Sequence, residues 1–262
     1  MEKSTYIGLI AAVIAIGAGM VLKGASLSAL LNPAAILIIL GGTVACIFVG
    51  FPMEDLNKVP KLFKIMFTTQ ALVSKTELIN QIGEWATISR REGLLSLESK
   101  AEEVEDEFLR EGMRMVIDGN DPTFIREVLM ENITSMEERH RQGALIFTQA
   151  GTYAPTLGVL GAVVGLIAAL GNLNEIEALG HLISAAFVAT LLGIFTGYVL
   201  WHPMANKLKQ KSKKEALLKT MMAEGLLAIQ AGEPVLSINQ RLAVFLTPTE
   251  RKVMRVDKLE QA

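Results

Sequence analysis

Two long uncharged runs constrain this chain more than any other feature. Residues 142–174 contain no Asp, Glu, Lys or Arg, and residues 178–206 contain none either. Each run exceeds the roughly 20 residues that an α-helix needs to cross the hydrocarbon core of a bilayer. We therefore expect two membrane-spanning helices joined by a short turn.

Two further apolar runs precede them. Residues 4–22 are uncharged, as are residues 24–53, where Asn32 and Pro33 form a helix start that leads to a second helix ending near Phe51. The first run is too long for the core of a signal peptide, and more spans follow it. With 51% hydrophobic residues, the chain is expected to be an all-α membrane protein with four transmembrane helices.

The basic residues predict the orientation. Clusters of Lys and Arg follow the second run, precede the third and follow the fourth, whereas the other two loops are nearly free of them. The positive-inside rule then places both termini and the middle segment in the cytoplasm. We expect spans 1 and 2 in 1–52, a helical cytoplasmic domain inserted in 53–146, spans 3 and 4 in 147–203 and a helical cytoplasmic tail in 204–262.

Helix signals fill the two cytoplasmic segments. Ser74 and Glu77 form a capping box, and Asp121 before Pro122 starts a helix that is able to continue into the third span. In the tail we expect an amphipathic helix from about Lys214, a break at 232–234 and a short helix to about Phe245. No sustained alternation of a strand is present.

Prolines and small residues mark the third and fourth spans. Pro155 removes the helical partner of the Gly151 carbonyl, and Pro203 does the same to that of Val199. We expect a kink at Pro155, with the hydroxyls of neighbouring Thr152 and Thr156 satisfying freed carbonyls. Strips of Gly and Ala at steps of four residues predict close helix packing. Ordinary packing and functional movement both remain open as interpretations.

The residues of common enzymes are missing. The sequence has no phosphate-binding glycine loop, nucleophile elbow or zinc spacing, and its histidines are scattered. We expect no enzyme activity, no cofactor, no metal site and no nucleic-acid partner. The spans also lack an interior Asp or Glu, the usual proton carrier in a membrane. Any protonatable group must therefore come from another chain, since threonine hydroxyls line a path but store no proton.

Several segments together resemble the bacterial flagellar motor stator A-subunit family (MotA/PomA), and they occur in the family's order along almost the whole chain. These are residues 151–158 (GTYAPTLG), 189–194 (ATLLGI), 202–208 (HPMANKL) and 89–98 (SRREGLLSLE). The resemblance implies a multi-pass protein of the bacterial cytoplasmic membrane, with five copies surrounding two single-span B-subunits whose aspartate carries the ion.

The resemblance also implies residue roles. Charged residues at 90–98 would contact the rotor protein FliG, namely Arg90, Arg91 and Glu98, although without the resemblance such a cluster is more typical of a solvated helix face. An ion path would pass Thr190, Thr156 and Tyr153. Movement would be coupled to ion binding through Pro155 and Pro203.

Ion choice follows from two alanines. Sodium-type relatives place hydroxyls at the positions of Ala162 and Ala189, and oxygen ligands are what a hard cation requires. Their absence predicts proton transport. The alternative is a proton-driven energiser of the ExbB/TolQ kind, which usually has three spans. A small-solute transporter would show an inverted repeat with polar groups at mid-membrane, and neither is visible.

Overall fold

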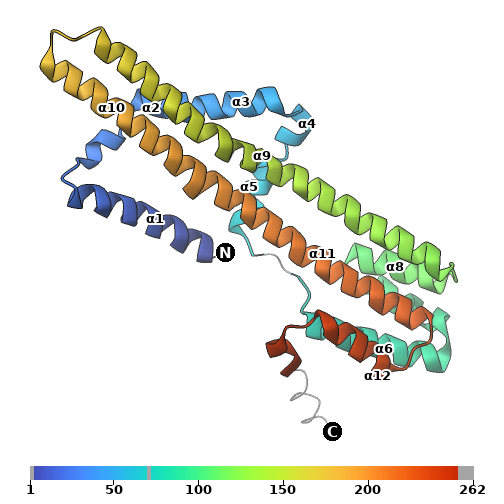
Figure 1. Ribbon diagram of the computed structural model, residues 1–262. Helices are drawn as coiled ribbons and strands as arrows, with labels where there is room; N and C mark the ends of the chain where they lie inside the picture. The colour runs from blue at the N-terminus through green and yellow to red at the C-terminus, as the bar shows by residue number, and fades with distance from the viewer. Residues whose placement is uncertain (1–2, 70–71, 253–262) are drawn as a thin grey trace. The chain divides into compact units, whose positions relative to one another are not determined.

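A computed structural model describes residues 3–69 and 72–252. Over these residues every regular element is a helix and no strand occurs (Figure 1). Four helical segments are long and apolar enough to cross a membrane: Lys3–Leu22, Leu27–Gly50, Pro122–Leu170 and Ile176–Gln230. The expected all-α class with four membrane helices is confirmed. The last part of the expected tail, residues 253–262, lies outside the described residues.

The chain divides into two compact units. The first comprises Met1–Gln70 and Arg139–Gln210, and the second comprises Ala71–Glu138 and Lys211–Ala262. Two helices contribute to both units, because α9 (Pro122–Leu170) and α11 (His202–Gln230) each contain a unit boundary.

The first unit begins with α1 (Lys3–Leu22), which has no buried residue. The second span follows as η1 (Leu27–Leu30), α2 (Pro33–Ile36), η2 (Leu37–Gly41) and α3 (Gly42–Gly50). Its predicted start is confirmed, since Asn32 Oδ1 accepts the Ala35 amide at 3.1 Å. The sequence did not predict the π-turn of η2. The buried hydroxyl of Thr43 donates to the Ile39 carbonyl there at 2.6 Å, a bond that bends or widens a helix.

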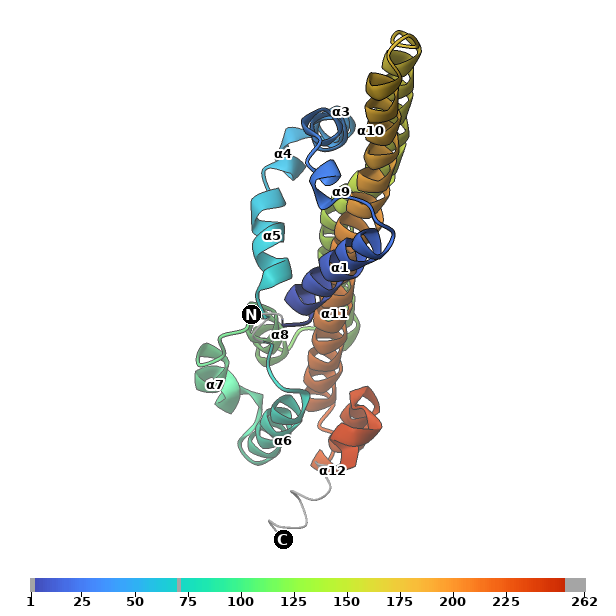
Figure 2. The same cartoon turned by 90° about the vertical axis from the view of Figure 1, so that its left-hand side faces the viewer.

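Two short helices, α4 (Met53–Leu56) and α5 (Val59–Phe67), follow α3 (Figure 2). Helix α5 is anchored by aromatic contacts, since the Phe63 ring meets the edge of Phe147 with centroids 5.1 Å apart. Trp201 completes this cluster, with its ring centroid 6.3 Å from that of Phe147. Met66 is buried beside it. The end of the second span is thereby fixed to the third and fourth.

The third span is the C-terminal part of a single helix, α9. Asp121 Oδ1 accepts the Thr123 amide at 2.8 Å at its start, so the predicted continuation from Pro122 into the membrane is confirmed. The fourth span is α10 (Ile176–Phe195), which passes through η4 (Thr196–Trp201) into α11 without a break. The expected separate tail helix from Lys214 is therefore wrong. Neither Gly nor Pro occurs between Pro203 and Gly225, so nothing ends the helix in this stretch.

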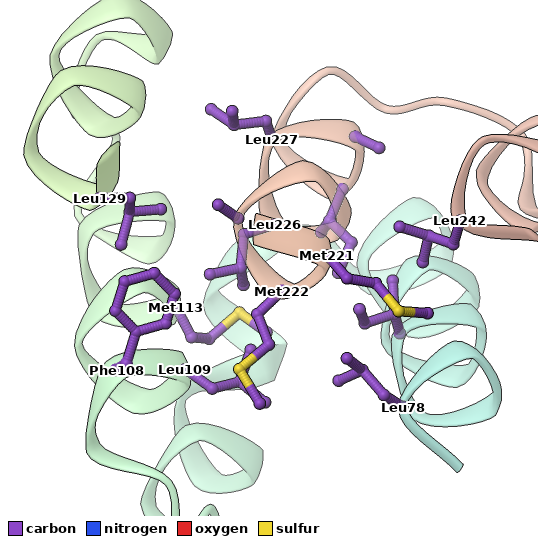
Figure 3. Packing of buried hydrophobic residues seen from close by; sticks show 14 of the residues in the cluster. Leu78, Phe108, Leu109, Met113, Leu129, Met221, Met222, Leu226, Leu227 and Leu242 are labelled. Carbon is purple, nitrogen blue, oxygen red and sulfur yellow. The ribbon is translucent and has the colours of Figure 1, made fainter. Parts of the chain in front are cut away.

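The second unit is a helical domain with one apolar core. Its elements besides α9 and α11 are α6 (Lys75–Glu92), η3 (Leu94–Leu97), α7 (Glu98–Glu102), α8 (Glu107–Ile117), α12 (Val235–Leu242) and η5 (Ala243–Phe245). The predicted capping box of Ser74 and Glu77 is present. Figure 3 shows Leu78, Met113, Met221, Met222 and Leu226 packed together from three helices. The core also fixes the turn between α6 and α7, because Leu97 is fully buried in it.

Candidate functional site

The third and fourth spans touch backbone to backbone. A Cβ atom built on Gly193 would lie 2.7 Å from the Cα of Gly158 and 2.8 Å from the Ala154 carbonyl. One on Gly165 would lie 3.1 Å from the Cβ of Ala186. The predicted close packing of the small-residue strips is confirmed, and α9 and α10 lie side by side along these residues (Figure 1).

Pro155 lies at the same interface. A Cβ on Gly197 would approach the proline ring to 2.6 Å and the Gly151 carbonyl to 2.8 Å. Pro155 lacks the amide hydrogen that would normally bond to the Gly151 carbonyl. That carbonyl therefore faces the Cα of Gly197, which allows a weak C–H···O contact. The expected rescue by threonine is wrong. Thr152 donates to Thr148 at 3.1 Å and Thr156 to Tyr153 at 2.7 Å, because a helical hydroxyl reaches only the carbonyls three or four residues back.

Pro203 follows a second π-turn. In η4 the His202 amide donates to the Gly197 carbonyl, five residues back. Proline cannot supply the next regular amide, so the widened turn directly before it has a physical cause. The Tyr198 ring lies 5.3 Å from that of His202, and His202 covers Gly151, where a Cβ would lie 2.8 Å from the imidazole. The proline was the sequence signal for this turn, although the turn itself was not predicted.

The three predicted ion-path residues differ in burial and in their position along the helices. The Thr190 side chain is half-buried, and its hydroxyl donates to the Ala186 carbonyl at 3.3 Å. Thr156 is exposed. Tyr153 belongs to the aromatic cluster, with its hydroxyl 3.8 Å from a Cβ built on Gly50. Because Ala189, next to Thr190, contacts Gly158 and Gly161, Thr190 lies more than one helical turn along α9 from Tyr153.

The two alanines predicted to govern ion choice differ in environment. Ala189 is 2% exposed and clusters with Ala35, Ile39 and Ala154. Its Cβ would lie 3.2 Å from a Cβ on Gly161, so a larger side chain at 189 would push the two spans apart. Ala162 is only half-buried. A hydroxyl at 162 would be the more accessible of the two.

A charged turn projects from the second unit. Arg90 and Arg91 lie in the last turn of α6, Gly93 turns the chain with φ of 86°, and Glu98 begins α7. All three charged side chains are exposed, and within residues 3–69 and 72–252 none forms an ion pair or side-chain hydrogen bond. Leu95, which the sequence did not single out, is 73% exposed between them. The turn therefore offers unpaired charges around one apolar side chain.

The described residues contain no group of three or more His, Cys, Asp or Glu side chains placed to hold a metal ion. Cys46 is a free, half-buried thiol.

Comparison with known proteins identifies the family of the chain. The model of the MotA/TolQ/ExbB proton channel family matches residues 100–221, and that of the motility protein A N-terminal region matches residues 6–93. Motility protein A of Bacillus subtilis is 54% identical over 251 residues, which are 96% of this chain and 93% of that protein. The chain belongs to the motility protein A family. Chemotaxis protein PomA of Vibrio alginolyticus is 31% identical over 96% of this chain and 98% of its own length.

Solved structures of the motility protein A family share the fold. A chain of the flagellar MotAB stator complex from Bacillus subtilis matches with a TM-score of 0.91 over 95% of this chain and 98% of that one, at 54% identity. A chain of C. jejuni MotAB matches with a TM-score of 0.90 at 32% identity, over 95% and 97%. The predicted family and the predicted function as a flagellar stator subunit are confirmed. The match of residues 6–93 to a motility protein A region favours this function over the ExbB/TolQ alternative.

Proposed function

We propose that the chain is the A-subunit of a proton-driven flagellar stator and works only with a single-span B-subunit. The observation that carries this proposal is 54% identity to a motility protein A over almost the whole chain, combined with spans that hold no Asp or Glu in their interior. Proton relays in membranes use acidic or histidine side chains. An aspartate of the B-subunit is the group that completes the path, and the solved relatives are MotAB complexes.

The membrane potential supplies the energy that turns the ring. Five copies form a ring around two B-subunit helices, and each proton that passes turns the ring by one step. One charge that crosses 100 mV releases roughly 2.3 kcal/mol, so many crossings drive one revolution. Thr190, Thr156 and Tyr153 lie beside the path in this proposal, and all three offer hydroxyls without a charge of their own.

The prolines and the charged turn transmit the step. Pro155 interrupts the hydrogen bonding of the third span where its backbone touches that of the fourth, and Pro203 interrupts the hydrogen bonding directly after η4. A small change at either proline alters the angle between the two helices. The exposed turn with Arg90, Arg91 and Glu98 then presses on FliG in the rotor. Lack of hydroxyls at Ala162 and Ala189 supports protons over sodium.

The proposed topology places the protein in the bacterial cytoplasmic membrane, with both termini inside the cell. Residues 1–52 and 147–203 hold the spans, residues 53–146 form the torque-transmitting domain and residues 204–262 the tail. Basic residues beside the inner ends of the spans support this orientation.

Flux measurements test the function. Vesicles that contain the purified chain alone should show no proton permeability above that of empty vesicles. Co-reconstitution with a single-span partner that bears one intramembrane aspartate should produce it. Proton flux through the chain alone would refute the proposal, as would a partner whose aspartate can be replaced by asparagine without loss of flux.

A further inference from the structure

An amphipathic pocket opens where the first span meets the end of the fourth. Its volume is about 410 Å³, far more than the share of roughly 30 Å³ that a single water molecule takes in the liquid. All of its lining belongs to the first unit. The lining side chains come from α1, α5, η4 and the first turns of α11, chiefly Ser4, Thr5, Leu9, Val199, Pro203 and Lys207.

The polar groups of the pocket gather at one end. Lys207 Nζ donates to Ser4 Oγ at 3.1 Å, which holds an ammonium beside a hydroxyl, and Thr5 lies next along α1. Lys3 adds a second exposed cation at the start of the same helix. A cation and hydroxyl donors held together favour an anion with several oxygens.

The other end is apolar. Leu9 lies one turn of α1 beyond Thr5, and Val199 and Leu200 lie one to two turns of η4 and α11 before Lys207. Met66 is 1% exposed and lines the pocket with a flexible, adaptable side chain. The lining therefore changes along one axis of the pocket from charged to apolar, as a phospholipid does from its headgroup to its acyl chains.

We infer that this pocket binds an anionic phospholipid of the cytoplasmic leaflet, with the phosphate on Lys207 and Ser4 and the start of an acyl chain beside Leu9. Basic pockets between membrane helices on the cytoplasmic side take anionic headgroups. The lipid would join α1 to α11 one turn after Pro203. The leaflet rests on the proposed orientation, whereas the binding chemistry does not.

Native mass spectrometry of the full chain, purified with its B-subunit in detergent, tests the site. We expect phosphatidylglycerol to bind more tightly than phosphatidylcholine with the same acyl chains. Lys207→Gln should weaken binding of phosphatidylglycerol about tenfold, the loss expected for one charge-assisted hydrogen bond, and Lys207→Arg should restore it. Lys209→Gln is the matched control, because Lys209 is exposed on the same helix and does not line the pocket.

A second pair of variants tests the apolar end. A Cβ on Gly8 would have no atom within 4 Å, so Gly8→Phe fills the pocket without a backbone clash and should abolish lipid binding. Gly19 is equally open and lies outside the pocket, so Gly19→Phe should leave binding unchanged.

Three results would overturn the inference. The first is phosphatidylglycerol binding that neither Lys207→Gln nor Gly8→Phe changes. The second is binding of inorganic phosphate that depends on Lys207 while the lipid does not bind, which would indicate a free-anion site. The third is no lipid binding together with a complex that Gly8→Phe dissociates, since the pocket would then be filled by a neighbouring copy of the chain.

Discussion

At the scale of single residues, the glycines between the third and fourth spans determine how closely the two backbones can approach. No hydrophobic force brings helices together in lipid, so contact depends on dispersion and on backbone approach. Gly158 and Gly193 permit an approach that any side chain would prevent. Their substitution tests the interface with the smallest possible change of volume.

Gly193→Ala should destabilise the protein in detergent by about 1–3 kcal/mol, the usual penalty for overpacking a close contact. Its Cβ would meet the backbone of Gly158 at 2.7 Å, and backbone moves less readily than a side chain. The thermal unfolding midpoint measures the effect. Gly19→Ala, with no atom within 4 Å of the added Cβ, is the control and should leave the midpoint near that of the wild type.

Asp121 at the start of α9 predicts a pH dependence. Its pKa is held below the ordinary 3.8, chiefly by the hydrogen bond from the Thr123 amide and then by the Thr123 hydroxyl. A lowered pKa in the folded state gives stability that is present above pH 3.8 and is lost as the pH falls through the folded-state pKa. The difference in unfolding midpoint between wild type and Asp121→Ala should therefore shrink below pH 3.8. A constant difference down to pH 2 would contradict this assignment.

At the scale of helices, interruptions of hydrogen bonding were the hardest features to predict. Hydropathy and capping residues predicted the four spans, the helix start at Pro33 and the continuation from Pro122, since these depend on local chemistry. The π-turns η2 and η4 and the true course of α11 depend on hydrogen bonds and on the lack of any stop signal over many residues. The threonine hydroxyls at Pro155 were misassigned because a proline-freed carbonyl lies outside their reach.

The residues of the candidate site divide in the same way, into those that local sequence predicts and those whose environment depends on distant contacts. Motif residues such as Pro155 and Arg90 were visible from residue type. The burial of Ala189 and the exposure of Leu95 result from packing between distant segments, which no local pattern records.

Pro155→Ala tests the interrupted helix. The substitution restores an amide for the Gly151 carbonyl and removes the ring that packs on Gly197, so the regular hydrogen bonding of α9 should become continuous. We expect motility to fall well below that of the wild type while the complex with the B-subunit still purifies intact. Ala168→Gly, at an exposed position on the same helix and away from the proline, serves as a control for helix weakening. Normal swimming of the Pro155→Ala strain would remove the proposed coupling role.

At the scale of the whole molecule, the charged turn is the proposed point of force. Arg90→Glu should leave membrane insertion and assembly intact and lower torque, and reversal of a facing acidic residue in the rotor protein should restore part of it. Tethered-cell rotation measures torque. Glu92→Lys, a neighbouring reversal outside the predicted contact set, should have the smaller effect. Loss of insertion in Arg90→Glu would instead indicate a structural role.

Ion choice belongs to the same scale, because it requires the assembled path. Swimming speed should follow the proton gradient and stay constant as external sodium is removed at fixed pH. Dependence on sodium would refute the proposal that Ala162 and Ala189 exclude it.

Helices α9 and α11 each run unbroken from a membrane span into the second unit, and this has a mechanical consequence. Adding one residue to either helix between the units would turn everything beyond it by about 100° and shift it by about 1.5 Å. An insertion of one residue in only one of these helices would therefore rotate its apolar face out of register with the core of the second unit.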